Sequence, residues 1–435
     1  MNKRKVFRAL VEGCKDILIV LLTCSALWLL PRTQLLGSLN GLLQEEAPQV
    51  STGQTQTETR AEAARPLRMM AMLPVGSARY GVQYDETACD ILFQQVAGPL
   101  REVLSSAGTP EPITRRAWES ALTTAPSVCF DFQGEVPLSV LTGWLSGEPG
   151  QLTADVRRVA LAVWNDGLAL YYRDEKTGAY YRCRSEVADP VRLEDTLAGL
   201  NGNGSYYAFE SEQYDMLDPD TLLNEEVRER AVYSVSNPVP GEREVLEALA
   251  DELSFTINAN GVYYAGEWVA RSENDTLRLS NRGVMDYLAG GAESIHFLTS
   301  GESLFDAVET CRQLAVTALG PRCGQARLYL LSAEETQQGI DIRFGYCLNG
   351  SPVWMKEGYA ARFLVNGGRV SNFTLNFRSY TDMGTTCSVL PPRQAAAALE
   401  AMGQTGEELA LVYLEQEDET LAAGWVAAER SFEER

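Results

Sequence analysis

The sequence predicts an α+β protein in which an N-terminal transmembrane helix precedes two or three extracytoplasmic domains of antiparallel sheet with packed helices. An uncharged run follows a basic N-terminus, and short apolar strands alternate with amphipathic helices along the rest of the chain. Gly- and Pro-rich turns separate these elements. The 435 residues, 45% of them hydrophobic, suit two or three domains, because a domain typically holds about 100–200 residues.

The N-terminal apolar run spans residues 17–30 and contains no charged side chain. As a helix it would be about 21 Å long, which is short for a hydrocarbon core of about 30 Å. Lys15 and Arg32 can extend towards the headgroups, and Trp28 suits an interface. The five basic residues before the run are Lys3, Arg4, Lys5, Arg8 and Lys15. We therefore predict a single-pass cell-membrane protein with a cytoplasmic N-terminus and an anchor that includes Ile17, Leu22, Ser25, Ala26, Trp28 and Leu30.

Three other interpretations of this run remain open. A cleaved signal peptide has an apolar core of similar length, but no small-x-small pair follows the run where cleavage would occur. A lipoprotein cleavage site at Cys24 would leave six apolar residues after the cysteine, and Thr23 is a poor neighbour for it. A buried helix of a soluble core is the third. The basic flank favours the uncleaved anchor.

The order of segments predicts five parts. Residues 1–31 form the cytoplasmic tail and the anchor, and residues 32–66, rich in Gln, Thr, Glu and Ala, form a flexible linker. A Pro-rich sequence, SNPVPG, marks the end of the first folded domain. The predicted folded parts are a first α+β domain over 67–235, a middle α+β unit over 236–300 and a C-terminal helix-on-sheet domain over 301–435.

Each folded part has its own sequence of predicted elements. The first domain opens with a strand over 67–75, an amphipathic helix over 86–108 and a second helix that begins at Thr114. A meander of strands follows, with turns at residues 165–167 and 176–178. The middle and last parts are predicted to contain helices over 243–255 and 304–319, strands over 261–290 and 326–380, a helix after the double proline at 391–392, and two closing strands.

The composition argues against catalysis and against nucleic acid. A net charge of −22 and a pI near 4.6 exclude a nucleic-acid partner, because phosphate neutralisation requires clustered Lys and Arg. His296 is the only histidine, and it lies in a strand-like segment, SIHFLTS, where a structural role is expected. No G-x-S-x-G, H-E-x-x-H or P-loop sequence occurs. We predict no catalytic residue, no metal site and no cofactor.

Seven cysteines lie after the anchor region, an odd number without short spacings. They are Cys89, Cys129, Cys183, Cys311, Cys323, Cys347 and Cys387. Because most have apolar neighbours in the sequence, we predict that they are mainly buried and reduced, with a Cys311 to Cys323 bridge as the alternative.

The C-terminal part carries a Tyr-x-Leu-Asn-Gly-x-Pro hairpin, a strand ending in Arg-x-Tyr, a Leu-Pro step before an Ala-rich helix, and a tryptophan in the final strand. The motif residues are Tyr346, Gly350, Pro352, Arg378, Tyr380, Pro391 and Trp425. This pattern resembles the YycH/YycI family of membrane-anchored regulators, as does the middle region that contains LSFTINANGVYY and TLRLSNRGVMDY. The cysteine content and the short anchor depart from the family.

The resemblance implies a non-enzymatic regulator. Members of this family cross the membrane once and regulate an essential cell-envelope sensor histidine kinase, partly through helix contacts inside the bilayer. The implied partners are a membrane histidine kinase, a related regulator protein and membrane lipid. Two alternatives remain: an extracytoplasmic scaffold or binding protein for envelope assembly, and a wall-polymer hydrolase with two carboxyl groups about 5–10 Å apart in a cleft.

Overall fold

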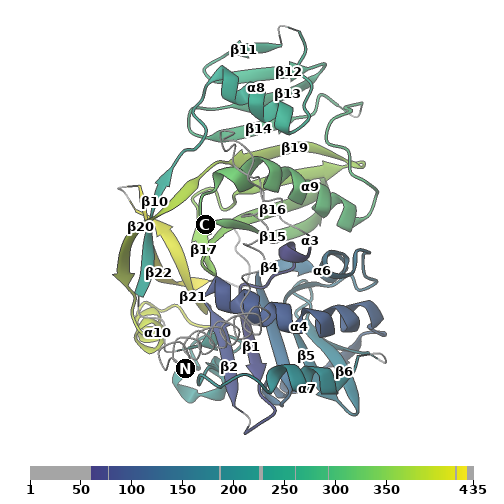
Figure 1. Ribbon diagram of the computed structural model, residues 1–435, viewed down its shortest axis with the longest axis vertical. Helices are drawn as coiled ribbons and strands as arrows, with labels where there is room; N and C mark the ends of the chain where they lie inside the picture. Colours follow the sequence, from purple (N-terminus) through teal and green to yellow (C-terminus); the bar gives the residue numbers. More distant parts are fainter. Residues whose placement is uncertain are drawn as a thin grey trace, which may run out of the picture. The chain divides into compact units, whose positions relative to one another are not determined.

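The N-terminal sheet contains seven antiparallel strands in the order β2-β1-β4-β5-β6-β7-β3 (Figure 1). Its central strands are rich in Val, Leu, Ala and aromatic residues, which favour the pleated conformation. The strands are β1 (Arg68–Met72), β2 (Arg79–Gln83), β3 (Glu111–Ile113), β4 (Ser127–Pro137), β5 (Asp155–Trp164), β6 (Gly167–Arg173) and β7 (Tyr180–Arg184).

The computed structural model describes residues 60–76, 78–185, 188–224, 229–259, 261–291, 293–416 and 419–428. The predicted anchor and most of the predicted linker lie outside these residues. Within the described ranges, no helix is both long enough and apolar enough to cross a membrane. These ranges contain antiparallel sheets with packed helices, so the predicted α+β class is confirmed for them.

Helices pack on both faces of the N-terminal sheet. Adjacent residues of β4 point to opposite faces, so Phe130 joins the core under α4 (Glu86–Ser106) whereas Cys129 joins the core under α5 (Arg115–Thr123). The hydroxyl of Thr114 accepts a backbone N–H at 3.2 Å and starts α5 where the sequence predicts. The other helices of this part are α3 (Arg60–Ala63), α6 (Leu138–Ser146) and α7 (Pro190–Leu197).

A segment over residues 203–224 closes the outer edge of β2. The side-chain amide of Asn203 accepts from the backbone N–H of Gly81 at 3.1 Å and donates to its carbonyl at 2.7 Å. Both backbone groups of that edge residue are therefore satisfied without a neighbouring strand. The segment contains β8 (Tyr206–Tyr207), η1 (Ala208–Glu210), η2 (Glu212–Tyr214) and β9 (Leu222–Leu223).

The second sheet contains thirteen strands, of which only the pair β17 and β21 is parallel. The order is β11-β12-β13-β14-β19-β18-β16-β17-β21-β22-β10-β20, and β15 pairs with β16. The strands are β10 (Glu229–Ser236), β11 (Val262–Tyr264), β12 (Trp268–Ser272), β13 (Asp275–Leu279), β14 (Val284–Leu288), β15 (Arg327–Thr336), β16 (Gly339–Leu348), β17 (Ser351–Trp354), β18 (Ala361–Asn366), β19 (Arg369–Asn376), β20 (Ser379–Ser388), β21 (Glu408–Glu415) and β22 (Thr420–Ala428). Its helices are α8 (Arg243–Glu252), α9 (Leu304–Leu319), η3 (Gly320–Arg322) and α10 (Pro392–Ala401).

Strands from all three predicted folded parts contribute to this second sheet. The middle strand β14 pairs with β19 along five residues, and β10, from the end of the predicted first domain, pairs with β20 and β22. Figure 1 shows α8 over β12 and β13, and α9 packs on β16, β18 and β19. The division into three domains remains a prediction about independently folding units.

The segment SIHFLTS forms a loop between β14 and α9, where the sequence predicts a strand. Its only strand-like contact among the described residues is a single bridge between Leu298 and Arg369. The side chains of Ser294 and His296 turn inward to bond Asp275, and this polar contact replaces a continuous ladder. The alternating pattern around His296 therefore did not predict the backbone conformation, and Ile295 is exposed.

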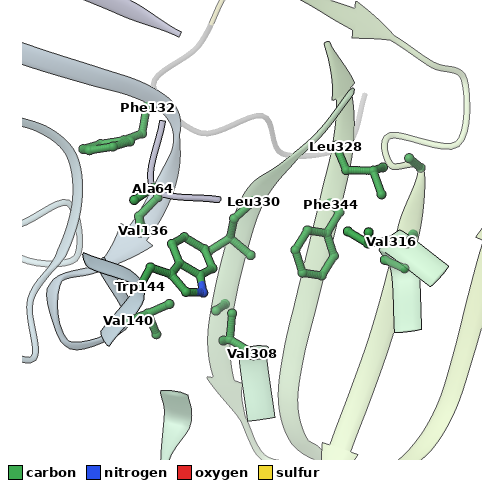
Figure 2. Close-up of a cluster of buried hydrophobic side chains, with 14 of the residues drawn as sticks. Ala64, Phe132, Val136, Val140, Trp144, Val308, Val316, Leu328, Leu330 and Phe344 are labelled. Atoms are coloured by element: carbon green, nitrogen blue, oxygen red, sulfur yellow. The ribbon is translucent and has the colours of Figure 1, made fainter. Parts of the chain in front are cut away.

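An apolar contact joins the two sheets, and we call its residues Val136, Trp144, Val308 and Leu330 the apolar junction. Figure 2 shows the indole of Trp144 beside Leu330, with Val136 on the same side as the indole and Val308 below. The close approach needs two glycines. A Cβ on Gly134 would lie 2.2 Å from the Leu330 carbonyl oxygen, and one on Gly143 would lie 2.4 Å from the Phe305 ring.

Candidate functional site

Five ionised side chains are buried at a second contact between the sheets. We call them the charged junction, and they are Arg68, Asp131, Arg157, Arg158 and Glu408. None has more than 9% of its surface exposed. Buried charges are rare unless they are paired, so this cluster is the strongest electrostatic feature among the described residues.

Glu408 lies at the centre of the charged junction. One of its carboxylate oxygens contacts Arg157 at 2.5 Å and Arg158 at 2.6 Å, and the other accepts a hydrogen bond from Arg68. Asp131 accepts from Arg158 at 2.9 Å and lies 3.4 Å from Arg157. Glu408 therefore bridges three guanidinium groups, and Arg157 and Arg158 each contact both carboxylates.

Burial alone would raise the pKa of the Asp131 and Glu408 carboxyls. The neighbouring guanidinium groups of Arg157, Arg158 and Arg68 outweigh that effect and hold the pKa of both carboxyls below its ordinary value. Both side chains are therefore ionised at neutral pH. With a contact of 4.0 Å from Arg158 to Asp218, three positive charges face three negative ones.

The charged junction joins segments that are far apart in the sequence. Arg68 is the first residue of β1, and Glu408 is the first residue of β21, 340 positions later. The chain enters β1 from the side of the predicted linker and anchor. The strand that follows the linker is thereby tied directly to the second sheet, and a displacement of one would strain buried ion pairs to the other.

A second polar cluster holds the loop between β14 and α9. We call Asp275, Tyr287, Gly290, Ser294 and His296 the Asp275 network. The Asp275 carboxylate accepts from the Gly290 N–H at 2.7 Å, the Ser294 hydroxyl at 2.5 Å and the Tyr287 hydroxyl at 3.0 Å, and it lies 2.8 Å from Nδ1 of His296. These contacts hold the pKa of Asp275 below its ordinary value against the effect of burial.

In space, the His296 imidazole lies between the Ser272 hydroxyl and the Asp275 carboxylate, as the histidine of a hydrolase triad does. The Ser272 hydroxyl lies 3.4 Å from Nε2 of His296, which is long for a hydrogen bond. Ser272 is only 4% exposed and pairs with Asp275 across the β12–β13 hairpin, and the ring of Phe255 covers the imidazole at 4.7 Å. This arrangement serves to hold the loop and gives a substrate no approach to the hydroxyl.

Comparison with known proteins places the fold but gives no match at the level of sequence. The sequence matches no family model, and it matches no curated protein. The crystal structure of YycH from Bacillus subtilis is similar to this chain with a TM-score of 0.54 and 9% sequence identity, over 85% of this chain and 95% of YycH. The chain has the YycH-type fold.

A second similarity is too low to indicate a shared fold. The dehydratase domain of MlnD from Bacillus amyloliquefaciens aligns with a TM-score of 0.12 and 10% identity, over 62% of this chain and 97% of that domain. The YycH-type fold confirms what the sequence motifs predict about the architecture. It does not assign a partner or a catalytic role by itself.

The motif residues that suggest the YycH-type fold have structural contacts. The buried rings of Tyr346 and Tyr380 meet edge to face at 5.4 Å, and the Tyr346 hydroxyl donates to the Asn376 carbonyl at 3.0 Å. Trp425 donates to the Leu390 carbonyl at 2.8 Å, beside Pro391, which precedes α10. The other motif contacts are the left-handed Gly350 with a φ of 76°, Pro352 opposite Cys347, and Arg378 with Glu357 at 3.3 Å.

The anchor residues named from the sequence lie outside the described residues. They are Ile17, Leu22, Ser25, Ala26, Trp28 and Leu30. The charged junction was missed, although the adjacent Arg157 and Arg158 inside an otherwise apolar strand, VRRVALAV, are a signal that could have indicated it. Two arginines in a buried strand require carboxylates nearby.

No disulfide forms among the seven cysteines of the described part of the chain, and the alternative Cys311 to Cys323 bridge is not present. Six of these cysteines are buried, and Cys387 is half-buried. Burial raises the pKa of the Cys89, Cys129, Cys183 and Cys347 thiols, which disfavours the reactive thiolate. Over the same described ranges, no group of three His, Cys, Asp or Glu side chains is arranged to hold a metal ion.

Proposed function

We propose that this protein is a membrane-anchored regulator that binds and modulates an envelope-sensing histidine kinase and catalyses no reaction itself. The observation that carries the proposal is the YycH-type fold over 85% of the chain. The basic N-terminus and the apolar run over residues 17–30 support a single-pass topology with the folded part outside the cytoplasm.

The charged junction offers a physical route between the folded part and the anchor. Arg68 lies two residues after the last residue of the predicted linker and is bonded to Glu408 in the second sheet. A partner that displaces the two sheets relative to each other would therefore act on β1, the first strand after the predicted linker in the sequence. In this proposal the anchor contacts the kinase helix in the bilayer, through small residues such as Ser25 and Ala26.

The proposal is tested in membranes with the full chain. The tagged protein is purified in mild detergent, co-purified proteins are identified, and autophosphorylation of any histidine kinase is measured in proteoliposomes with and without the protein. We expect a histidine kinase to co-purify and its autophosphorylation to change. Co-purification of wall-assembly enzymes without a kinase would favour the scaffold alternative.

A matched pair of variants separates the anchor from the folded part. One variant replaces residues 17–30 by an unrelated apolar span of equal length, and the other is Glu415→Ala, at the exposed end of β21. We expect the first to lose kinase regulation and the second to retain it. Normal regulation by the first variant would show that the anchor does not make the contact.

A reporter fused after residue 60 tests the topology, and cytoplasmic activity of this reporter would refute it.

A further inference from the structure

A pocket of about 300 Å³ opens beside the N-terminal end of α9, at the side of the second sheet. Three chain segments enclose it: the loop that leads into α9, the turn between β15 and β16, and the turn between β18 and β19. Its lining residues are Thr299, Gly301, Glu302, Ser303, Ala307, Gly339, Ile340, Val365, Asn366, Gly367 and Gly368. The volume is sufficient for one or two large side chains.

Three apolar side chains line part of the pocket. Ala307, Ile340 and Val365 supply these side chains from a helix and two strands, and Ala307 and Val365 belong to the buried core. Four of the remaining lining residues are glycines, which add no side chain to the pocket, and the other four, Thr299, Glu302, Ser303 and Asn366, are polar. An apolar side chain from another molecule would therefore find both space and contact area there.

The pocket carries one ionisable side chain, the carboxylate of Glu302. Glu302 is exposed, and no ion pair to it forms among the described residues. The partial positive charge at the start of α9 is already balanced, because Asp306 and Ser303 form a capping box and Ser300 donates to Asp306 at 2.9 Å. The mouth of the pocket is thus suited to a cation.

Two exposed apolar side chains lie on the same loop. Ile295 is 68% exposed and Leu298 is 54% exposed. Leu298 precedes Thr299 of the pocket, and its backbone pairs with Arg369, which follows Gly368 of the pocket. Leu298 therefore stands at the edge of the pocket.

The Asp275 network makes this loop rigid. Ser294 and His296 point into the network, so Ile295 between them is directed outward. Phe297 has a φ of 52°, an unfavourable conformation for a bulky residue, and its ring packs on Tyr287 at 4.7 Å. A loop that is held in place at such a cost, with two apolar side chains in water, is typical of a binding surface.

We propose that this pocket and its apolar edge bind an extended segment of a partner protein, in which a bulky apolar side chain stands next to Lys or Arg. The apolar side chain enters between Ala307, Ile340 and Val365, and the basic side chain meets Glu302. Leu298 and Ile295 cover the partner's backbone from the loop side. The site goes beyond the proposed function, because it names a recognition surface that does not depend on the anchor.

The test uses the full chain in detergent micelles and a phage-displayed library of random twelve-residue peptides as the probe. Enriched sequences are synthesised with a fluorophore, and their affinities are measured by fluorescence anisotropy. We expect enrichment of peptides with Leu, Phe or Trp beside Lys or Arg. Glu302→Lys and Leu298→Ser should each weaken binding about tenfold, because one reverses the charge and the other removes the apolar edge.

Glu293→Lys is the matched control, since Glu293 is an exposed acid on the same loop that does not line the pocket. It should change the affinity less than about threefold. The proposal fails if no peptide is enriched, if the enriched peptides lack the apolar and basic pair, or if Glu302→Lys binds them like the unaltered chain. Efficient disulfide formation between two copies of a Leu298→Cys variant would assign the surface to self-association instead.

Discussion

The apolar junction and the charged junction both connect the N-terminal sheet to the second sheet, but they use opposite chemistry. At the apolar junction, Trp144 packs beside Leu330, with the indole N–H donating to Glu309 at 3.2 Å (Figure 2). At the charged junction, Glu408 binds three arginines without access to water. Apolar contact is non-directional, whereas the ion pairs require each partner in place.

This difference predicts that substitutions at the apolar junction lower the free energy of unfolding in graded steps. Removal of a charge at the charged junction should lower it abruptly. A truncated apolar side chain loses contact area in proportion to its size, and its neighbours relax partly. Removal of one buried carboxylate leaves several guanidinium groups uncompensated, and no relaxation supplies the missing charge. Variants of Glu408 and Leu330 test this contrast, and variants of His296 and Glu135 extend the comparison to other buried polar groups.

Glu408→Ala should have the largest effect. The substitution removes the carboxylate that Arg68, Arg157 and Arg158 share, so part of their buried positive charge is no longer neutralised. The free energy of unfolding should fall by about 3–5 kcal/mol. Urea unfolding of the full chain in detergent, followed by circular dichroism, measures the loss. Glu415→Ala, at the exposed end of the same strand, should change it by less than about 0.5 kcal/mol. A similar loss of stability in Glu408→Ala and Glu415→Ala would show that the buried carboxylate is no more important than the exposed one.

Leu330→Ala should cost about 3 kcal/mol, and Leu330→Met should cost less than about 1.5 kcal/mol. The graded pair tests whether the apolar junction depends on volume. Leu288 is the control, because it is 59% exposed and its replacement by Ala removes little buried surface. The same urea titration applies. Equal losses for Ala and Met at position 330 would contradict a volume-dependent contact.

His296→Gln should cost about 1–2 kcal/mol, because it disturbs the Asp275 network and leaves buried polar groups poorly paired. Kinase regulation should persist, since the imidazole is buried and holds a loop. Thermal unfolding and kinase autophosphorylation are measured together, with Ser272→Ala as the milder variant. Loss of all regulation in a folded His296→Gln protein would overturn the non-enzymatic proposal.

Glu135→Gln should change the pH dependence of stability and not lower the stability equally at every pH. Burial, together with the nearby carboxylates of Glu175, Glu334 and Asp155, raises the pKa of Glu135 from 4.5 to about 7 and outweighs the opposing charge of Arg157. Between pH 4.5 and about pH 7, Glu135 keeps its proton in the folded state but has lost it in the unfolded state. The Glu135 contribution to stability therefore falls as the pH rises through this range.

The measurement is the urea midpoint at pH 5 and at pH 8. We expect the unaltered chain to lose more stability than Glu135→Gln between these two values, because glutamine does not titrate. Parallel profiles for the two proteins would show that Glu135 is not protonated in the folded state near neutral pH.

Much of the fold could be predicted because its determinants are local. Thr114 starts a helix through a bond to a backbone group three residues away, and the turn at residue 165 needs only a residue that tolerates a φ of 53°. The pairing of β14 with β19 could not be read in this way, because many strands of similar composition compete for the same neighbour.

The candidate site was less accessible to sequence reasoning. Arg157 and Arg158 are visible as charges in an apolar strand, but nothing near them in the sequence indicates Glu408 as their partner. His296 was correctly expected to be structural, yet its partner Asp275 lies 21 residues away and its strand was wrongly predicted. Side-chain pairs at such separations depend on how the whole chain packs.

The sequence by itself determined the basic and apolar N-terminus, the acidic net charge, the starts of several helices and the presence of a single histidine. These properties depend on composition or on neighbours within a few residues. The tertiary structure alone decided that Arg68 meets Glu408, that the loop around His296 is held by Asp275, and that a pocket opens beside Glu302. Each of these requires two distant segments to meet, and the free energy that brings them together belongs to the packing of the two sheets as a whole.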